Sequence, residues 1–269
     1  MDIHEYQAKK ILSDFGILIP RGGIAYSPEN AEFKAREIGG SKWVVKAQVH
    51  SGARGKAGGI KICDTELEVA QSTDKLLGKK LITNQTGPSG KIINRVYIEE
   101  ATQIEKELYL GLVFDRASES IMVVASAEGG MSVEEISQQK PESIIRSKIE
   151  VAVGMQDFQA REIAFNLGIK PELVSRTASV IVACSRIFSE LDATMVEINP
   201  LVITKDNQVL ALDCKMSFDN NALFRRNNIS ELRDKSQENQ NEIYASDRGL
   251  NYVGLEGNIG NIINGAGLA

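Results

Sequence analysis

Residues 195–215, MVEINPLVITKDNQVLALDCK, decide how the rest of the chain is interpreted. They form two apolar runs rich in β-branched residues, and the polar cluster at 205–208 between them predicts a β-hairpin. Side chains alternate between the two faces of a strand, so Glu197 and Asn199 share one face of the first strand. The hairpin therefore presents a carboxylate and an amide on an otherwise apolar sheet.

The length of the hairpin loop sets which residues of the two strands face each other. A two-residue turn would point Asp213 away from Asn199, whereas a three-residue loop, or a bulge at Pro200, would place the two residues directly opposite. We predict one of the latter two arrangements, which gathers Glu197, Asn199 and Asp213 on one patch. Mg²⁺ prefers hard oxygen ligands, so this patch is a candidate metal site. The alternative is an amphipathic hairpin with a solvated polar face.

The composition is that of a globular protein with one large domain or two modest ones. The chain has 269 residues, of which 42% are hydrophobic and 25% are charged. A net charge of −5 argues against a nucleic-acid partner bound through a basic surface. No apolar run approaches the ~20 residues that span a membrane, and no signal-peptide pattern opens the chain. We expect neither nucleic-acid nor membrane binding.

Cysteine usage indicates a reducing compartment. Cys63, Cys184 and Cys214 are odd in number, far apart and without a CxxC pair, so neither a disulfide nor a zinc site is expected. A cytoplasm fits this pattern. Because no Arg- and Ser-rich transit segment follows Met1, we expect a bacterial cytoplasm rather than a mitochondrial matrix.

Apolar periodicity and capping residues predict alternating helices and strands. The expected helices lie within 2–16, 27–39, 65–77, 156–167 and 171–191. The expected strands are at 43–49, 60–63, 95–98, 106–114 and 121–125, the last two as an antiparallel pair. The final stretch, GNIGNIINGAGLA, begins like a buried strand followed by a glycine turn.

A glycine-rich loop, HSGARGKAGG at 50–59, directly follows the strand WVVKAQV. Its glycines allow backbone N–H groups to approach a polyphosphate, and Arg54 and Lys56 would neutralise it. The loop matches neither GxxxxGK[ST] nor a dinucleotide fingerprint, so a flexible surface turn is the alternative. Lys46 on the preceding strand faces a partly buried site and needs an anion, supplied by a ligand or by a neighbouring acid.

The acidic residues after the next strand are further candidates. Residues 99–102 link two sheet-forming halves and offer backbone groups to a flat base, while Glu107 could accept from ribose hydroxyls. Solvated acids are the alternative for both. The two histidines, His4 and His50, form no recognisable set of nucleophile, base and acid. If the reaction needs a histidine intermediate, that residue comes from another chain.

Six segments together resemble a known family. They are HEYQAKKIL, WVVKAQVHSGARGKAGG, EEATQIEKELYLG, VEINPLVIT, LDCKMSFDNNALFR and LNYVGLEGNIGNIINGAGLA. In this order, and over essentially the whole chain, they resemble the β subunits of ADP-forming succinyl-CoA synthetases, also called succinate–CoA ligases. The resemblance implies an α+β fold of the ATP-grasp type, in which two α+β subdomains hold the nucleotide between them.

The resemblance also implies domain boundaries. An ATP-grasp domain at 1–228 would contain an inserted, lid-like subdomain at about 21–104, and a polar linker would follow at 229–247. Residues 248–269 would be the start of a flavodoxin-like α/β CoA-ligase domain, represented by its first strand only. Because the family continues beyond this point, we expect the chain to be a fragment or a short form truncated in that domain.

Residue roles follow from the same resemblance. The positions that match ATP-binding residues are Lys46, Ala53, Arg54, Gly55, Glu99, Thr102 and Glu107. The positions that match Mg²⁺ ligands are Asn199 and Asp213, and Glu197 lies close to the phosphoryl-transfer site in an auxiliary catalytic role. Asn264 matches a substrate-binding position. Ala53 stands where the family often has glycine; alanine is small, and it is tolerable there if its φ is negative.

The implied activity is that of a succinyl-CoA synthetase β subunit in the tricarboxylic acid cycle: succinate, CoA and ATP give succinyl-CoA, ADP and phosphate, with Mg²⁺. The partner α subunit would bind CoA and carry a transiently phosphorylated histidine that exchanges phosphate with the nucleotide. Two alternatives remain open. The chain could be a non-catalytic nucleotide-binding remnant of a split gene, or belong to an ATP-grasp ligase for another acid such as malate.

Overall fold

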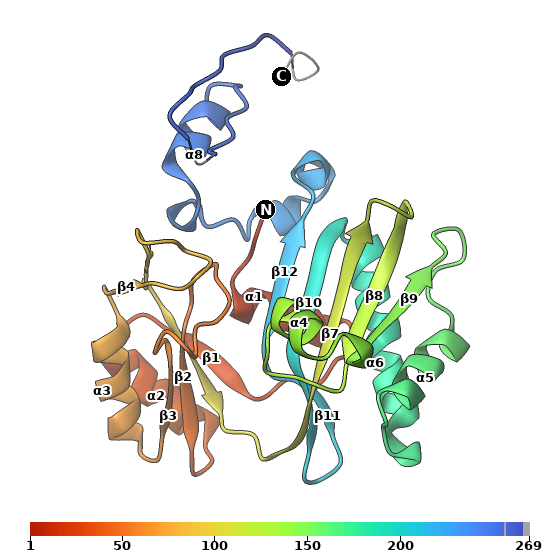
Figure 1. Ribbon diagram of the computed structural model, residues 1–269. Helices are drawn as coiled ribbons and strands as arrows, with labels where there is room; N and C mark the ends of the chain where they lie inside the picture. The colour runs from red at the N-terminus through yellow and green to blue at the C-terminus, as the bar shows by residue number, and fades with distance from the viewer. Residues whose placement is uncertain (256, 266–269) are drawn as a thin grey trace. The chain divides into compact units, whose positions relative to one another are not determined.

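The computed structural model describes residues 1–255 and 257–265 (Figure 1). The chain divides into a large unit, Met1–Arg233, and a small unit, Asp234–Ala269. The large unit contains two main antiparallel β-sheets, each with its own hydrophobic core. Its α-helices are α1 (Glu5–Asp14), α2 (Pro28–Ile38), α3 (Glu66–Leu76), α4 (Val133–Gln139), α5 (Asp157–Asn166), α6 (Pro171–Glu190) and α7 (Asn227–Ser230). Its 3₁₀ turns are at Pro141–Ser143 and Asn220–Arg225.

The smaller sheet is built from residues early in the chain. Its strand order is β1 (Gly22–Ala25), β6 (Val96–Glu100), β2 (Trp43–Ala47), β3 (Ile60–Cys63). Helices α2 and α3 pack together on one face, where Val45 and Ala47 of β2 are buried. Because side chains alternate along a strand, Val44 and Lys46 point to the opposite face. A separate hairpin joins β4 (Lys80–Leu81) to β5 (Lys91–Ile92).

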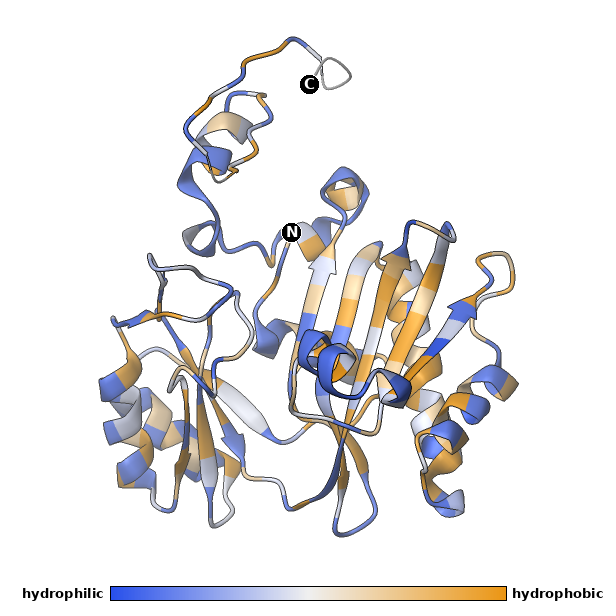
Figure 2. Ribbon diagram, viewed as in Figure 1, coloured by the Kyte–Doolittle hydropathy of each residue, from blue (hydrophilic) through white to orange (hydrophobic). Residues whose placement is uncertain are grey.

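The larger sheet and its helices form the second part of the large unit. Its order is β11 (Val209–Ala211), β10 (Ala193–Thr204), β7 (Ile104–Asp115), β8 (Ser120–Ser126), β9 (Ile144–Ile149), and β12 (Cys214–Phe218) also pairs with β10. Leu108, Leu110 and Leu112 of β7 belong to the core that this sheet forms with α1, α5 and α6. Helix α4 lies on the other face (Figure 1). Apolar residues dominate the central strands, as Figure 2 shows.

The hairpin has the predicted register. Residues 205–207 form a three-residue loop, closed by a hydrogen bond of 3.0 Å from Thr204 N to Gln208 O. Asn199 therefore lies opposite Asp213, and its N–H donates to the Asp213 carbonyl oxygen at 3.1 Å. The pairing of β10 with β7 also shifts in register between Ile198 and Leu201. Of the two alternatives that the sequence offered for the hairpin alignment, the three-residue loop is the one that sets it, since the register shift lies in the pairing with β7.

Most expected elements form, with differences at their ends. Ser27 Oγ caps α2 by accepting from Asn30 N at 3.2 Å, as the sequence predicts. Helix α1 begins at Glu5 with His4 as its N-cap, because Asp2 instead bridges to Ser217 of β12. Helix α4 and strand β9 were not expected. The signal for α4 is the capping box SVEE at 132–135.

The small unit is described by itself. It contains a 3₁₀ turn at Lys235–Gln237 and the short helix α8 (Gln240–Ser246), so part of the predicted polar linker is helical. The strand expected near 257–263 does not form in the described residues, and Ile259 and Ile262 are exposed. A strand needs a neighbour for its backbone hydrogen bonds, and the described part of this unit has none. No helix in the described ranges has the length and apolarity that a bilayer crossing requires.

The larger core can be tested with two leucines of opposite exposure. Leu110 is 1% exposed and Leu67, on α3, is 62% exposed. We expect Leu110→Ala to lower the free energy of unfolding by about 2–5 kcal/mol, because it removes a buried side chain and leaves a cavity. We expect Leu67→Ala to change it by less than about 0.5 kcal/mol. Urea denaturation measures both, and equal effects would contradict the assignment of the core.

Candidate functional site

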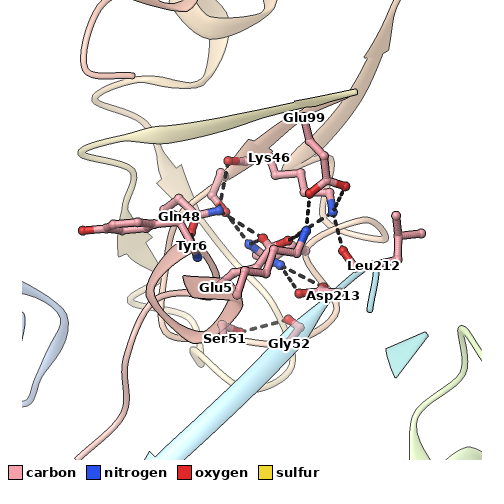
Figure 3. Close-up of polar contacts among 12 residues, drawn as sticks. Glu5, Tyr6, Lys46, Gln48, Ser51, Gly52, Glu99, Leu212 and Asp213 are labelled. Carbon is pink, nitrogen blue, oxygen red and sulfur yellow. Dashed lines mark hydrogen bonds and ion pairs between the residues drawn. The ribbon is translucent and has the colours of Figure 1, made fainter. Parts of the chain in front are cut away.

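A network of six charged side chains joins the smaller sheet to α1 and to the segment before β12 (Figure 3). Its three cations and three carboxylates are Lys9, Lys46, Arg54, Glu5, Glu99 and Asp213. Five of these side chains are at most 5% exposed, and Asp213 is 30% exposed. Charges buried in this way are tolerated when they are paired, so the equal numbers of cations and carboxylates allow the network to exist.

Lys46 is fully engaged in this network. Its Nζ donates to Glu5 Oε1 at 3.1 Å, to Glu99 Oε1 at 2.9 Å and to the Leu212 carbonyl oxygen at 2.8 Å. An ammonium group has three N–H donors, and these contacts use all of them. The anion that Lys46 requires is therefore supplied by neighbouring acids, which is one of the two possibilities that the sequence left open.

Arg54 connects the glycine-rich loop to the hairpin. Its Nη1 lies 2.7 Å from Glu5 Oε2 and donates to the Ala47 carbonyl oxygen at 2.8 Å. Its Nη2 lies 2.8 Å from each carboxylate oxygen of Asp213. The loop holds Arg54 in place through a hydrogen bond of 2.8 Å from Gly59 N to Arg54 O. The predicted phosphate ligand and the predicted metal ligand are thus paired with each other.

The backbone of this loop does not meet the condition that the sequence set for Ala53. Ala53 has a φ of 57°, in the left-handed region, and not the negative φ at which alanine is readily tolerated. Its carbonyl oxygen accepts from Ala57 N at 3.2 Å, and that of Gly55 accepts from Gly58 N at 3.1 Å, so the loop closes in tight successive turns. The left-handed conformation costs an L-residue about 1–2 kcal/mol, and only the loop geometry holds Ala53 there.

Glu5 and Lys9 are site residues that the sequence interpretation missed. Glu5 Oε1 lies 3.0 Å from Lys9 Nζ, and Glu5 Oε2 accepts from Gln48 Nε2 at 3.1 Å. Lys9 also pairs with Glu99. Burial alone would raise the pKa of Glu5, but Arg54, Lys46 and Lys9 hold that pKa well below its usual range. The available signal was the acid–base pair four residues apart on the apolar face of α1.

The predicted metal patch forms on the hairpin. Asn199 Oδ1 accepts from Gly130 N at 2.9 Å, and Asn199 Nδ2 donates to the Met131 carbonyl oxygen at 2.7 Å. Burial raises the pKa of the Glu197 carboxyl, and the charge of Asp213 raises it further. Glu197, Asn199 and Asp213 therefore lie together on the sheet, as the register requires.

The donors of this patch fit a Mg²⁺ ion that also binds a phosphate ligand. Across 1–255 and 257–265, no group of three or more His, Cys, Asp and Glu side chains is arranged to hold a metal ion. Mg²⁺ commonly takes one or two protein oxygens and completes its shell with water and phosphate oxygens. Asn199 and Asp213 suit an ion that arrives with a phosphate ligand, provided that Asp213 leaves Arg54.

The other predicted residues are placed differently. The carboxylate of Glu107 lies beside Gly130, in the loop that binds Asn199. A Cβ added at Gly130 would lie only 2.5 Å from Glu107 Oε2. Thr102 follows β6 and, among the described residues, takes no part in the charged network. Asn264 is exposed and belongs to the small unit.

An apolar strip borders the network on the smaller sheet. Val44 pairs with Ile62 and with Glu99, and Lys46 pairs with Ile60, so these five residues share one face. Ile62 is 72% exposed. The strip offers a surface for a flat apolar ring directly beside the cations, an arrangement suited to a ligand with a base at one end and phosphates at the other.

Comparisons with known proteins give the family. The family model described as an ATP-grasp domain matches residues 2–203. A probable malate–CoA ligase subunit beta from Mesorhizobium japonicum is 61% identical over 269 residues, which are 100% of this chain and 68% of that relative. A succinate–CoA ligase [ADP-forming] subunit beta from Bacillus velezensis is 49% identical, with 100% and 70% coverage. The chain belongs to the ATP-grasp family of CoA-ligase β subunits.

Solved structures agree with this family in fold. A dinucleotide-forming acetyl-coenzyme A synthetase from Ca. Korarchaeum cryptofilum has a TM-score of 0.62 at 20% identity, covering 81% of this chain and 93% of that one. An ATP citrate lyase from Methanothrix soehngenii has a TM-score of 0.66 at 18% identity, with 91% and 59% coverage. The α+β fold of the ATP-grasp type, expected from the sequence, is confirmed. Five of the six residues of the charged network lie inside the range that the family model matches, and Asp213 lies beyond its end.

Two adjacent lysines of α1 test the buried network of this family member. Lys9 has a fully buried side chain, whereas Lys10 pairs with Asp14 at the surface. We expect Lys9→Met to lower the free energy of unfolding by about 3–5 kcal/mol, because it leaves Glu5 and Glu99 short of a cation. Lys10→Met should have little effect. Chemical denaturation of both variants checks this, and similar stabilities would contradict the role of Lys9.

The loop that binds Asn199 gives a second test. A Cβ added at Gly129 would collide with the backbone of Glu107 and Leu108, whereas at Gly55 the nearest atom would be an Ile60 methyl at 3.7 Å. We expect Gly129→Ala to destabilise the chain by about 1–3 kcal/mol, because the loop must shift. Gly55→Ala should be tolerated. Thermal unfolding compares them, and a stable Gly129→Ala variant would show that the loop moves freely.

Proposed function

We propose that this chain is the nucleotide-binding β subunit of an acid–CoA ligase that converts an acid, CoA and ATP into an acyl-CoA, ADP and phosphate. The observation that carries the proposal is the network, which collects Lys46, Arg54 and Asp213 at one place in a chain that is 61% and 49% identical to named CoA-ligase β subunits. Two cations and a carboxylate at the edge of an apolar strip suit a nucleotide with bound metal.

Each proposed residue has a distinct task. Lys46, Arg54 and the backbone N–H groups at 53–55 would bind phosphate oxygens, because cations and glycine-loop donors stabilise them. The base would lie on the strip of Val44, Ile60 and Ile62, with 99–102 at its edge and Glu107 accepting from the ribose. Asn199 and Asp213 would hold Mg²⁺, which when bound neutralises the transferring phosphoryl group.

Two further residues bear on the chemistry. Glu197 lies beside Asn199 and Asp213, and burial raises the pKa of its carboxyl. We assign it an auxiliary role at the phosphoryl-transfer position. Asn264 would contact the acid substrate. The phosphohistidine and the CoA site would come from an α subunit, in keeping with the relatives, which are subunits by name.

The acid that we propose is a four-carbon dicarboxylate. Succinate matches the sequence resemblance and the name of the Bacillus velezensis relative, with a place in the tricarboxylic acid cycle. Malate, which adds one hydroxyl group to succinate, is favoured by the higher identity to the Mesorhizobium japonicum relative. A site built to bond that hydroxyl rejects the acid that lacks it, so one of the two should be strongly preferred.

Calorimetric titration of Mg·ADP into the purified chain tests nucleotide binding. We expect Asp213→Asn and Lys46→Met each to weaken binding about tenfold or more, because each removes a charged contact worth about 1.5–3 kcal/mol. Lys42→Met is the matched control, since Lys42 directly precedes β2 but is 61% exposed and pairs with Asp64. Circular dichroism confirms folding. A folded wild-type chain that binds no nucleotide would overturn the proposal.

The acid is tested with the full-length subunit and its α partner. We expect CoA-dependent ADP formation from ATP with succinate or with malate, and a preference for one of them of at least about tenfold. Acetate serves as the control, because it has a single carboxylate. Nucleotide binding without any acid-dependent turnover would favour the alternative of a non-catalytic nucleotide-binding protein.

A further inference from the structure

The carboxylate of Glu5 is held like a bound anion. Its Oε1 lies 3.1 Å from Lys46 Nζ and 3.0 Å from Lys9 Nζ, and its Oε2 lies 2.7 Å from Arg54 Nη1 and 3.1 Å from Gln48 Nε2. Four donors, from α1, β2, the residue after β2 and the glycine-rich loop, therefore converge on one buried side chain. Figure 3 labels Lys46 and Gln48 among them. Carboxylates and phosphates both accept hydrogen bonds from such cations through pairs of oxygens.

Two of these four donors are the cations that our proposed function assigns to nucleotide phosphates. Lys46 has all three of its N–H groups in use, and Arg54 divides its guanidinium between Glu5, Asp213 and the Ala47 carbonyl oxygen. A phosphate that reaches these cations must therefore take over contacts that a carboxylate already makes.

Charge balance also requires a carboxylate to give up its contacts with these cations when a phosphate binds. The network contains three cations and three carboxylates, so it is neutral as it stands. Asp213 can turn to a bound metal ion, which would release Arg54. Glu5 keeps Lys9 and Gln48 as partners if it leaves Lys46 and Arg54, whereas a nucleotide added beside an unmoved Glu5 would leave an excess of negative charge in a buried place.

We propose that Glu5 is an internal substitute for a nucleotide phosphate, whose carboxylate occupies the anion position between Lys46 and Arg54 and leaves it when a phosphate binds. This inference rests on the proposed function. The contact is autoinhibitory, because the Glu5 carboxylate competes with the ligand for the same cations. Nucleotide affinity is set by the difference between the free energies with which the phosphate and the carboxylate bind those cations.

The displaced contact also joins the two cores. Glu5 belongs to α1, whose apolar residues pack in the core of the larger sheet, while Lys46 and Glu99 lie on strands of the smaller sheet. When phosphate replaces Glu5, the ion pairs between α1 and the smaller sheet are exchanged for bonds through the ligand. Nucleotide binding is therefore linked to the spacing between the two layers.

Glu5→Gln tests the proposal, with Mg·ADP titrated by calorimetry into the full 269-residue chain. The amide keeps the shape of the side chain but not its charge, so we expect the dissociation constant for Mg·ADP to fall about tenfold or more, while the ligand-free melting temperature also falls. Asp14→Asn is the matched control, because it removes an exposed carboxylate from the same helix. Its dissociation constant should equal that of the wild type.

A second variant guards against poor folding of Glu5→Gln. The double variant Glu5→Gln with Lys9→Met removes one carboxylate and one cation, so the network stays balanced while the anion position is vacated. Lys9 is not among the proposed phosphate ligands. We expect this variant also to bind Mg·ADP more tightly than the wild type.

The outcomes separate this inference from the proposed function. Tighter binding in either variant supports the inference. If the wild type binds Mg·ADP and both variants bind it equally tightly or more weakly, the inference is overturned and the proposed function stands. If the folded wild-type chain binds no Mg·ADP, the proposed function is overturned, and this inference falls with it because it rests on that function.

Discussion

Neutralisation of the buried cations is the constraint on which this structure depends. Lys9, Lys46 and Arg54 are each held by two carboxylates, and the three carboxylates come from α1, β6 and the segment before β12. Isolated charges would be too costly when buried, so the elements must meet with the correct partners. The ion pairs thereby fix how α1, the smaller sheet and the hairpin come together, and apolar packing supplies most of the stability on either side.

The register of the hairpin is the second constraint. The three-residue loop places Asn199 opposite Asp213, which brings Asp213 within reach of Arg54. A shift by one residue would turn Asp213 to the other face and leave the guanidinium without its carboxylate. The buried network and the metal patch therefore share Asp213, so a ligand that binds at one must affect the other.

The sequence predicted the features that depend on local pattern. Alternation placed Glu197 and Asn199 on one face, and choosing the register that adds Asp213 to them gave the observed pairing, although the sequence alone left the loop length open. A lysine inside an apolar strand was enough to predict a paired cation at Lys46. Other features depend on distant contacts. Glu5 and Lys9 have the same spacing as Lys10 and Asp14, yet the first pair is buried and the second exposed, and only the tertiary fold distinguishes them. The left-handed Ala53 and the lack of a strand within the described residues 257–265 likewise depend on neighbours that no local pattern contains.

The loop around Gly130 has a consequence for the chemical identity of residue 199. The amide of Asn199 receives an N–H from Gly130 on its oxygen and gives an N–H to the Met131 carbonyl on its nitrogen, so its two ends cannot be exchanged. An aspartate would set a second oxygen against that carbonyl, with no proton between them. The fold therefore selects an uncharged side chain here and orients its oxygen without any ligand. The N–H and C=O groups of one backbone turn thus exclude a carboxylate at position 199, although the geometry of the patch would otherwise allow one.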